Sequence, residues 1–134
     1  MKIPWDLEGT PLQIKTDSSL GDGDKLWVKL YRTDNSSIGG VVVLFSSPIQ
    51  YRIGGCNEYT VLPVEPPVEV DKIWMITKTE TAITITCNNV EMLNYLFADS
   101  SNSKCEMDGD VVGQIMFDNR DGASDGYRSG KLPI

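Results

Sequence analysis

Short runs of β-branched and aromatic residues recur along the chain, separated by clusters of Gly, Asp, Asn and Ser. No segment keeps an apolar period of 3.6 residues for long, so the pattern disfavours a fold built from amphipathic helices. In the run 25–32 the even positions 26, 28 and 30 are aliphatic and the odd positions carry Trp27, Lys29 and Tyr31. This alternation predicts a strand with one buried face and one mixed aromatic and polar face. We therefore expect an all-β chain.

About eight or nine strands follow from this reading, with turn signals at regular spacing. The expected strands are 12–16, 25–32, 41–45, 49–53, 58–62, 72–78, 82–87, 90–98 and 110–118. Asn88-Asn89 makes a tight turn in the central meander, because Asn tolerates the left-handed conformation. The proline-rich segment 63–67 is expected to cross between sheets. The pattern predicts an antiparallel two-sheet sandwich or jelly roll, formed by one domain over 1–134 with a Gly- and Asp-rich C-terminal tail.

The charge balance and the lack of histidine exclude several classes of function. Nineteen acidic and twelve basic side chains give a formal net charge of -7, which disfavours nucleic acid and anionic membranes as partners. Without histidine there is no Ser-His-Asp or Cys-His catalysis and no His-ligated zinc. The longest apolar run, 41–45, is far too short for insertion into a membrane. We expect a protein that is not an enzyme.

The three cysteines bear on the cellular compartment. Cys87 and Cys105 flank one strand-like segment, and a disulfide between them would close a loop of about 19 residues, stabilising the fold by about 3 kcal/mol. This pairing leaves Cys56 over and favours a secreted or extracellular protein whose leader is absent from this sequence. The alternative is a cytoplasmic protein with three reduced, buried cysteines.

An acidic cluster in the C-terminal third raises the question of a metal. Carboxylates in glycine-rich loops suit calcium, which takes six to eight oxygen ligands at flexible geometry. The candidate ligands are Asp108, Asp110, Asp118, Asp121 and Asp125. Arg120 stands where an EF-hand loop would need a ligand. The alternative is a set of solvent-exposed turn residues with no cofactor.

Aromatic and amide side chains give a route to carbohydrate binding. Apolar sugar faces stack on Trp and Tyr, while Asn and Arg bind the hydroxyls. The candidate ligand-binding residues are Trp27, Tyr31, Arg52, Trp74, Asn88, Asn89 and Asn94. Core packing is the alternative for each tryptophan, and it is the favoured one for Trp74. Glycoside hydrolysis would need a pair of carboxylates across a cleft, and nothing in the sequence selects such a pair.

Three segments resemble the central hairpins of laminin-G, galectin and concanavalin-like sandwiches: KIWMITK at 72–78, ITITCNNVE at 83–91 and YLF at 95–97. They also resemble invertebrate extracellular modules labelled farnesoic acid O-methyltransferase-like. The resemblance implies a sandwich and, at the level of fold, carbohydrate binding. The galectin sugar motif depends on histidine, which this chain lacks, so no family site residue carries over.

We therefore expect a carbohydrate-binding, lectin-like recognition module. The alternative is a structural or adhesive extracellular domain that associates with another protein or with copies of itself, with Cys56 as a bridge between partners.

Overall fold

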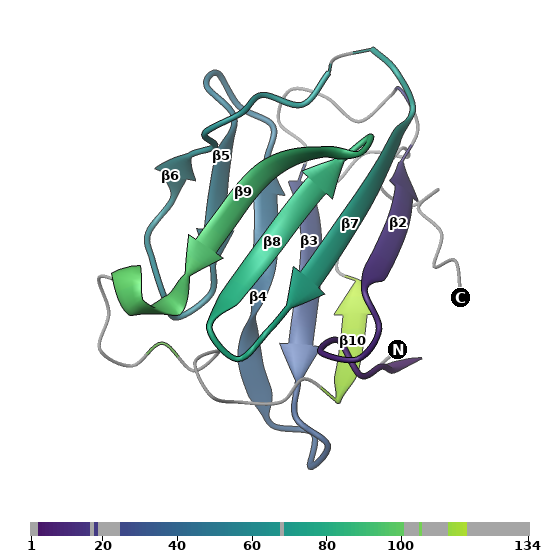
Figure 1. Cartoon of the computed structure of the whole chain (residues 1–134), viewed down its shortest axis with the longest axis vertical. Helices are drawn as coiled ribbons and strands as arrows, with labels where there is room; N and C mark the ends of the chain where they lie inside the picture. The colour runs from purple at the N-terminus through teal and green to yellow at the C-terminus, as the bar shows by residue number, and fades with distance from the viewer. Residues whose placement is uncertain are drawn as a thin grey trace.

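The computed structural model describes residues 3–16, 18, 25–67, 69–100, 105 and 113–117. They form two antiparallel sheets that lie face to face (Figure 1). The six-stranded sheet has the order β1 (Ile3–Pro4), β10 (Gln114–Phe117), β3 (Lys25–Tyr31), β4 (Ser37–Leu44), β5 (Gln50–Ile53) and β6 (Thr60–Val61). The four-stranded sheet has the order β2 (Leu12–Thr16), β7 (Lys72–Lys78), β8 (Ala82–Cys87) and β9 (Val90–Leu96). The predicted all-β sandwich is confirmed.

The strand ends differ from the sequence prediction in ways that have local causes. β4 begins at Ser37, four residues earlier than expected, because Gly39 and Gly40 lie inside the strand and not in a turn. β9 ends at Leu96, and the chain then forms a 3-10 turn over Phe97–Asp99, where the sequence predicted two more strand residues. In the described part of the chain no helix is long and apolar enough to cross a membrane.

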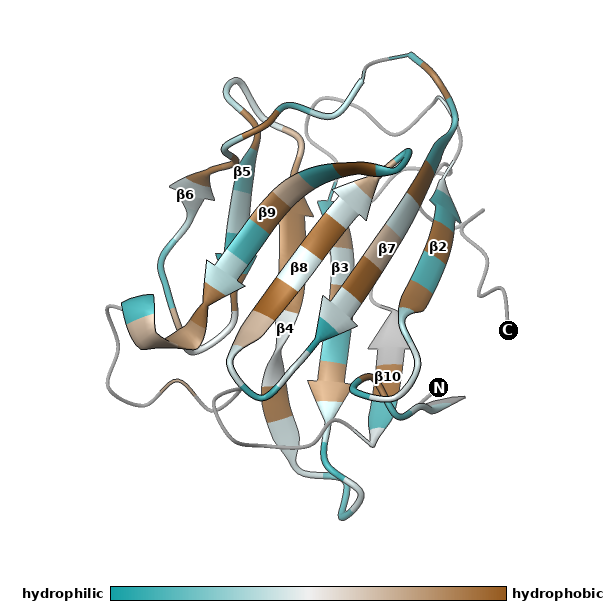
Figure 2. Cartoon of the chain, in the orientation of Figure 1, coloured by the Kyte–Doolittle hydropathy of each residue, from teal (hydrophilic) through white to brown (hydrophobic). Residues whose placement is uncertain are grey.

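The core lies between the two sheets and is built by alternation along each strand, visible as alternating bands of hydropathy in Figure 2. Trp74 of β7 is completely buried there. Its indole Nε1 donates a hydrogen bond to Thr16 Oγ1 at 2.9 Å, and the Phe45 ring meets it edge-on with ring centroids 5.9 Å apart. The structure thus places Trp74 in the core, and the prediction that it contacts a ligand is wrong.

Two lysines on β7 are buried on the same face as that tryptophan. Lys78 Nζ lies 2.7 Å from Glu8 Oε1 and 5.6 Å from the centre of the Phe97 ring. Lys72 Nζ donates to the carbonyl of Val70 at 3.1 Å. Alternate side chains of a strand point to the same face, so Lys72 and Lys78 share the inner face with Trp74. Because the two lysines lie at the two ends of β7, their ammonium groups reach polar partners at the margins of the core.

The disulfide joins Cys56 to Cys105, and Cys87 is a free, buried thiol. The predicted Cys87–Cys105 pair is therefore wrong. The topology brings the loop after β5 beside the end of the 3-10 turn, where Ser100 Oγ donates to the Cys56 carbonyl at 2.6 Å and the Tyr95 hydroxyl donates to it at 3.3 Å. Nearness in sequence favoured the shorter loop, whereas the folded chain brings the more distant cysteine to Cys105. Cys56 is consequently not available to bridge partners.

Candidate functional site: a groove on the six-stranded sheet

The odd-numbered side chains of β3 point away from the core, because Leu26, Val28 and Leu30 fill its inner face. The register of β3, β4 and β5 arranges the outward positions in rows. Trp27, Val42 and Arg52 form the first row, Lys29 and Gly40 lie in the second, and Tyr31 is opposite Ser37 in the third. Neighbouring rows are about 6.7 Å apart along a strand. Residues distant in sequence therefore meet on one outer surface.

This surface is hollowed into a groove of about 420 Å³, which we call the β3–β5 groove. Its lining consists of Trp27, Lys29, Tyr31, Ser37, Gly39, Gly40, Val42, Arg52, Gly54 and Gly55. β3, β4 and β5 are the rear strands in Figure 1, so the groove is on the side facing away from the viewer. Among the described residues it contains two cationic side chains and no carboxylate.

Glycines form the floor of the groove, because the backbone of β4 and the backbone just after β5 approach so closely that side chains would not fit between them. Gly54 N donates to Gly40 O at 2.7 Å, and a Cβ on Gly54 would lie 2.7 Å from the Gly40 nitrogen. A Cβ on Gly40 would also lie 3.1 Å from Trp27 Nε1. Gly39 adopts φ +120°, which side chains disfavour. The glycines thus allow the indole to lie across β4 and keep the groove open.

Two lysine ammonium groups lie close to the ring of Trp27. Lys29 Nζ is 5.1 Å and Lys25 Nζ is 5.7 Å from the ring centre, within the range of cation–π attraction. Val42, beside Trp27 in the same row, is only 6% exposed although it faces outward. An aromatic ring therefore covers apolar surface here and stays half-exposed itself.

Arg52 stands at the other side of the first row. Its guanidinium lies over the Tyr59 ring, with the carbon Cζ 5.8 Å from the ring centre. Its Nε is buried and has no hydrogen-bond partner among the described residues. No described carboxylate, Glu58 included, pairs with it. A buried donor without a partner costs about 1–3 kcal/mol. Because this Nε is buried, a ligand oxygen in the groove can reach it only if the arginine side chain moves.

A tight turn between β3 and β4 fixes the third row. Asp34 Oδ1 accepts hydrogen bonds from the backbone N of Ser36 at 2.9 Å and from its hydroxyl at 2.6 Å. These two bonds lower the pKa of the Asp34 carboxyl below its usual value. Asn35 adopts φ 75°, which Asn tolerates. The turn thereby holds Tyr31 opposite Ser37 at the end of the groove.

The structure divides the predicted binding residues into separate places. Trp27, Tyr31 and Arg52 meet in the β3–β5 groove. Asn94 is exposed on β9 of the other sheet, where Thr84 Oγ1 lies 3.4 Å from its Oδ1.

Asn88 and Asn89 make the β8–β9 turn, with φ values of 50° and 65°. Asn88 Oδ1 accepts a hydrogen bond from Ile73 N at 2.8 Å, so its side chain holds the hairpin. The asparagines therefore do not contribute to the groove.

The expected calcium ligands, Asp108, Asp110, Asp118, Asp121 and Asp125, all lie outside the described residues. Within the described ranges no group of three or more acidic or cysteine side chains is arranged to hold a metal ion. Calcium binding at the five aspartates stays a prediction.

Sequence reasoning did not select Lys29, Ser37, Val42 or the glycines of the lining. Lys29 was detectable, because it alternates with Trp27 and Tyr31 on the same face of one strand. The glycines gave no such signal, since glycine pairs in a sequence usually indicate turns. Only the pairing of β4 with β5 shows that they form a floor.

Comparison with known proteins finds likeness in structure only. No protein-family model and no curated protein matches the chain. A tetrameric galectin from the ball sponge Cinachyrella sp. superposes with a TM-score of 0.56 at 16% identity, covering 100% of this chain and 95% of the sponge chain. An ancestral congerin gives 0.55 at 10% identity, with 100% and 96% covered. The galectin-1-L2 of Dario rerio gives 0.53 at 9% identity, with 100% and 96% covered.

These likenesses define the class of fold as the galectin-like β-sandwich. At such low identity they establish the fold and nothing about the ligand. Nothing in them supports the resemblance to modules labelled farnesoic acid O-methyltransferase-like. The chain itself has no histidine, so any sugar site on this fold must be built from other side chains.

Proposed function

We propose that the protein is a non-enzymatic, lectin-like module that binds carbohydrate in the β3–β5 groove. One observation carries the proposal: a half-buried indole, a tyrosine and an arginine without a described carboxylate partner converge over a glycine floor on one sheet face. Saccharides need an aromatic face for their C–H patches and donors for their hydroxyl oxygens. The galectin-like fold of the lectins named above is consistent with this assignment.

The geometry fits a short stretch of a glycan chain. The Trp27 indole covers Gly40, whereas Gly54 and Gly55 at the end of β5 are partly or fully exposed and would let a pyranose ring approach the backbone beside the indole. Trp27 would supply the stacking surface, and Arg52 and Lys29 would donate to ring substituents. Tyr31, two rows from Trp27, is placed to contact a neighbouring sugar unit.

The test is binding to a glycan array, followed by calorimetry with the best ligand. We expect Trp27→Ala to lower the affinity at least tenfold, since an aromatic contact of about 1.4 kcal/mol corresponds to that factor. Ile73→Ala is the matched control, because Ile73 is 45% exposed on β7 of the opposite sheet. Each assay is run with calcium and with a chelator, which tests the predicted metal site in the same experiment.

An empty array under both conditions would overturn the proposal. Equal loss of affinity in the Trp27→Ala and Ile73→Ala variants would also do so, because it would show that the groove is not the binding surface. Circular dichroism of both variants confirms that the sandwich is intact before binding is measured.

The intramolecular Cys56–Cys105 disulfide supports a secreted or extracellular location, since such bonds persist in oxidising compartments. Intact mass after thiol alkylation in denaturant without reductant tests for this disulfide in the purified protein, because unfolding exposes the buried Cys87 thiol. One alkylated cysteine per chain is expected, and three alkylated cysteines would contradict it.

A second function, association with another protein or with a copy of this chain, is favoured by a different observation. The outer face of the four-stranded sheet exposes Ile73 at 45% and Leu96 at 44%. The sponge galectin is described as tetrameric. Light scattering across a range of concentrations, with Leu96→Asp as the disrupting variant, tests this function; a monomer at every concentration would exclude self-association.

A further inference from the structure

We infer that the saccharide bound in the β3–β5 groove is negatively charged, carrying carboxylate or sulfate groups. The inference rests on the proposed carbohydrate function and specifies the chemical class of the ligand. It starts from the charge of the groove, which is opposite to that of the whole chain.

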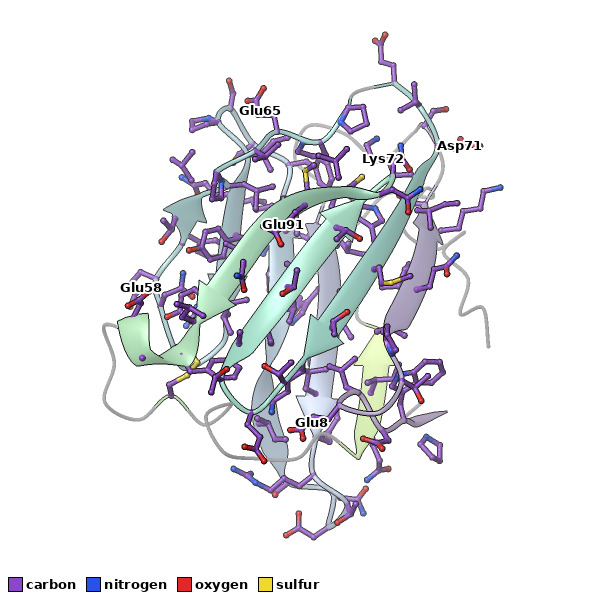
Figure 3. All side chains as sticks on the ribbon, viewed as in Figure 1. Glu8, Glu58, Glu65, Asp71, Lys72 and Glu91 are labelled. Carbon is purple, nitrogen blue, oxygen red and sulfur yellow. A yellow bond between two sulfur atoms is a disulfide. The ribbon has the colours of Figure 1, made fainter. Side chains whose placement is uncertain are left out.

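The protein has a formal net charge of -7, yet the described lining of the groove is cationic. Lys29 and Arg52 face into the groove, and Lys25 lies next to the Trp27 ring. Of the carboxylates labelled in Figure 3, Glu65 and Asp71 lie in loops at one end of the sandwich and Glu91 lies on β9, away from the groove lining. A cationic site on an acidic protein selects anionic ligands, since its positive charge attracts them locally while the remaining surface repels them.

Arg52 gives the site its geometric specificity. The guanidinium is held in position by the Tyr59 ring, with a centroid distance of 5.8 Å, and no described carboxylate pairs with it. Planar guanidinium groups bind carboxylate and sulfate through two parallel hydrogen bonds, to which the opposite charges add an attraction that neutral sugar hydroxyls do not supply. Its Nε is buried and lacks a partner among the described residues, so a small movement of the side chain toward an anion in the groove would cost it no existing hydrogen bond at that nitrogen.

The spacing of the groove separates the two kinds of contact that a charged saccharide needs. Trp27 and Arg52 occupy the same row on β3 and β5, with only Val42 of β4 between them. Neighbouring strands are about 4.8 Å apart, so the two side chains stem from positions about 9.6 Å apart. A sugar ring stacked on the indole would direct a charged substituent toward the arginine, while Lys29 in the next row neutralises further charge.

The experiment compares matched pairs of purified oligosaccharides by calorimetry. Oligogalacturonate is compared with its methyl ester, which keeps the chain and removes the charge. A heparin-derived sulfated oligosaccharide is compared with its desulfated, N-acetylated form. We expect at least one charged member to bind about tenfold or more tightly than its neutral counterpart, with an affinity that falls as salt rises. The pair that shows the difference identifies carboxylate or sulfate as the recognised group.

Arg52→Gln should abolish most of this charge preference, whereas Arg52→Lys should restore part of it. Lys15→Gln is the matched control, since it removes one positive charge from an exposed position on β2 of the opposite sheet. Thermal melts show whether each variant is folded, and Lys29→Gln provides a second groove variant if Arg52→Gln fails to fold.

Four outcomes would overturn one or both ideas. Equal binding of charged and neutral members would refute the charge inference and leave the carbohydrate function standing. No binding of any of these probes, together with an empty glycan array, would refute both. The preference for a charged member could survive unchanged in both Arg52→Gln and Lys29→Gln. It could also fall in the control Lys15→Gln by as much as in the groove variants. Either result would show that the groove does not select the charge.

Discussion

Reduction of the Cys56–Cys105 disulfide is expected to lower the free energy of unfolding by about 4 kcal/mol. The two cysteines are separated by 49 residues, and releasing a loop of that length restores about 4 kcal/mol of conformational freedom to the unfolded chain in the chain-entropy model. The folded state should relax little, because Ser100 Oγ and the Tyr95 hydroxyl still donate to the Cys56 carbonyl. For 134 residues the loss corresponds to a fall in Tm of roughly 14 °C.

The assay is a thermal melt and a urea titration of each protein with and without a phosphine reductant. Cys105→Ala should resemble the reduced native chain and should not respond further to reductant. Cys87→Ala should keep the full response, because Cys87 is a free thiol in the core. A response that disappears in Cys87→Ala but persists in Cys56→Ala would refute the pairing. A change of less than about 1 kcal/mol on reduction would refute the entropic argument.

Three further predictions follow from the core and the groove. Gly54→Ala should lower stability by about 2 kcal/mol in urea titrations and weaken saccharide binding, because its Cβ would lie 2.7 Å from the Gly40 nitrogen; unchanged stability would contradict the close approach of β4 and β5. In the same urea titrations, Glu8→Ala should lower the free energy of unfolding by roughly 3 kcal/mol, because it leaves the buried Lys78 ammonium without its carboxylate. Lys78→Met should lower it less, since it removes the buried charge; a larger loss in Lys78→Met would show that the ion pair does not account for the effect of Glu8→Ala. Burial raises the pKa of the Cys87 thiol from 9.0 to about 11, so between these values the unfolded chain loses a proton that the folded chain keeps. The free energy of unfolding should therefore fall as pH rises from 9 to 11, and a Cys87→Ala variant that falls equally would exclude the thiol as the source.

The sandwich was predictable because its strands are short, alternating and bounded by turn residues. The run 72–78 was predicted with the bounds that the structure shows, as were 12–16 and 82–87. β1 was missed, since a strand of two residues has too few positions to show a period. The predicted strand began at residue 41 and excluded Gly39 and Gly40, although tertiary pairing places both in the middle of β4.

The site was predictable only in part, and the reason is geometric. Trp27 and Tyr31 alternate on one strand, so the sequence itself places them on one face. Arg52 joins them through the register of β3, β4 and β5, which no local pattern determines. The exposure of Trp74 could not be predicted either, because its local sequence pattern resembles that of Trp27, yet its side chain lies on the inner face of the other sheet. Burial depends on which side of a strand faces the partner sheet, and that is a property of the whole fold.

The place of β10 determines when this protein can finish folding. β10 is the last described strand in the sequence, yet in the sheet it lies between β1 and β3 (Figure 1). On the ribosome, the β7–β8 and β8–β9 pairs lie within 25 residues (72–96), and β2, the other partner of β7, has already been synthesised, so this sheet can form as soon as the meander emerges. The six-stranded sheet must wait until residue 117 is available, so the pairing edges of β1 and β3 stay open for most of synthesis. Nascent chains should therefore depend on chaperone protection of those edges until β10 closes the gap.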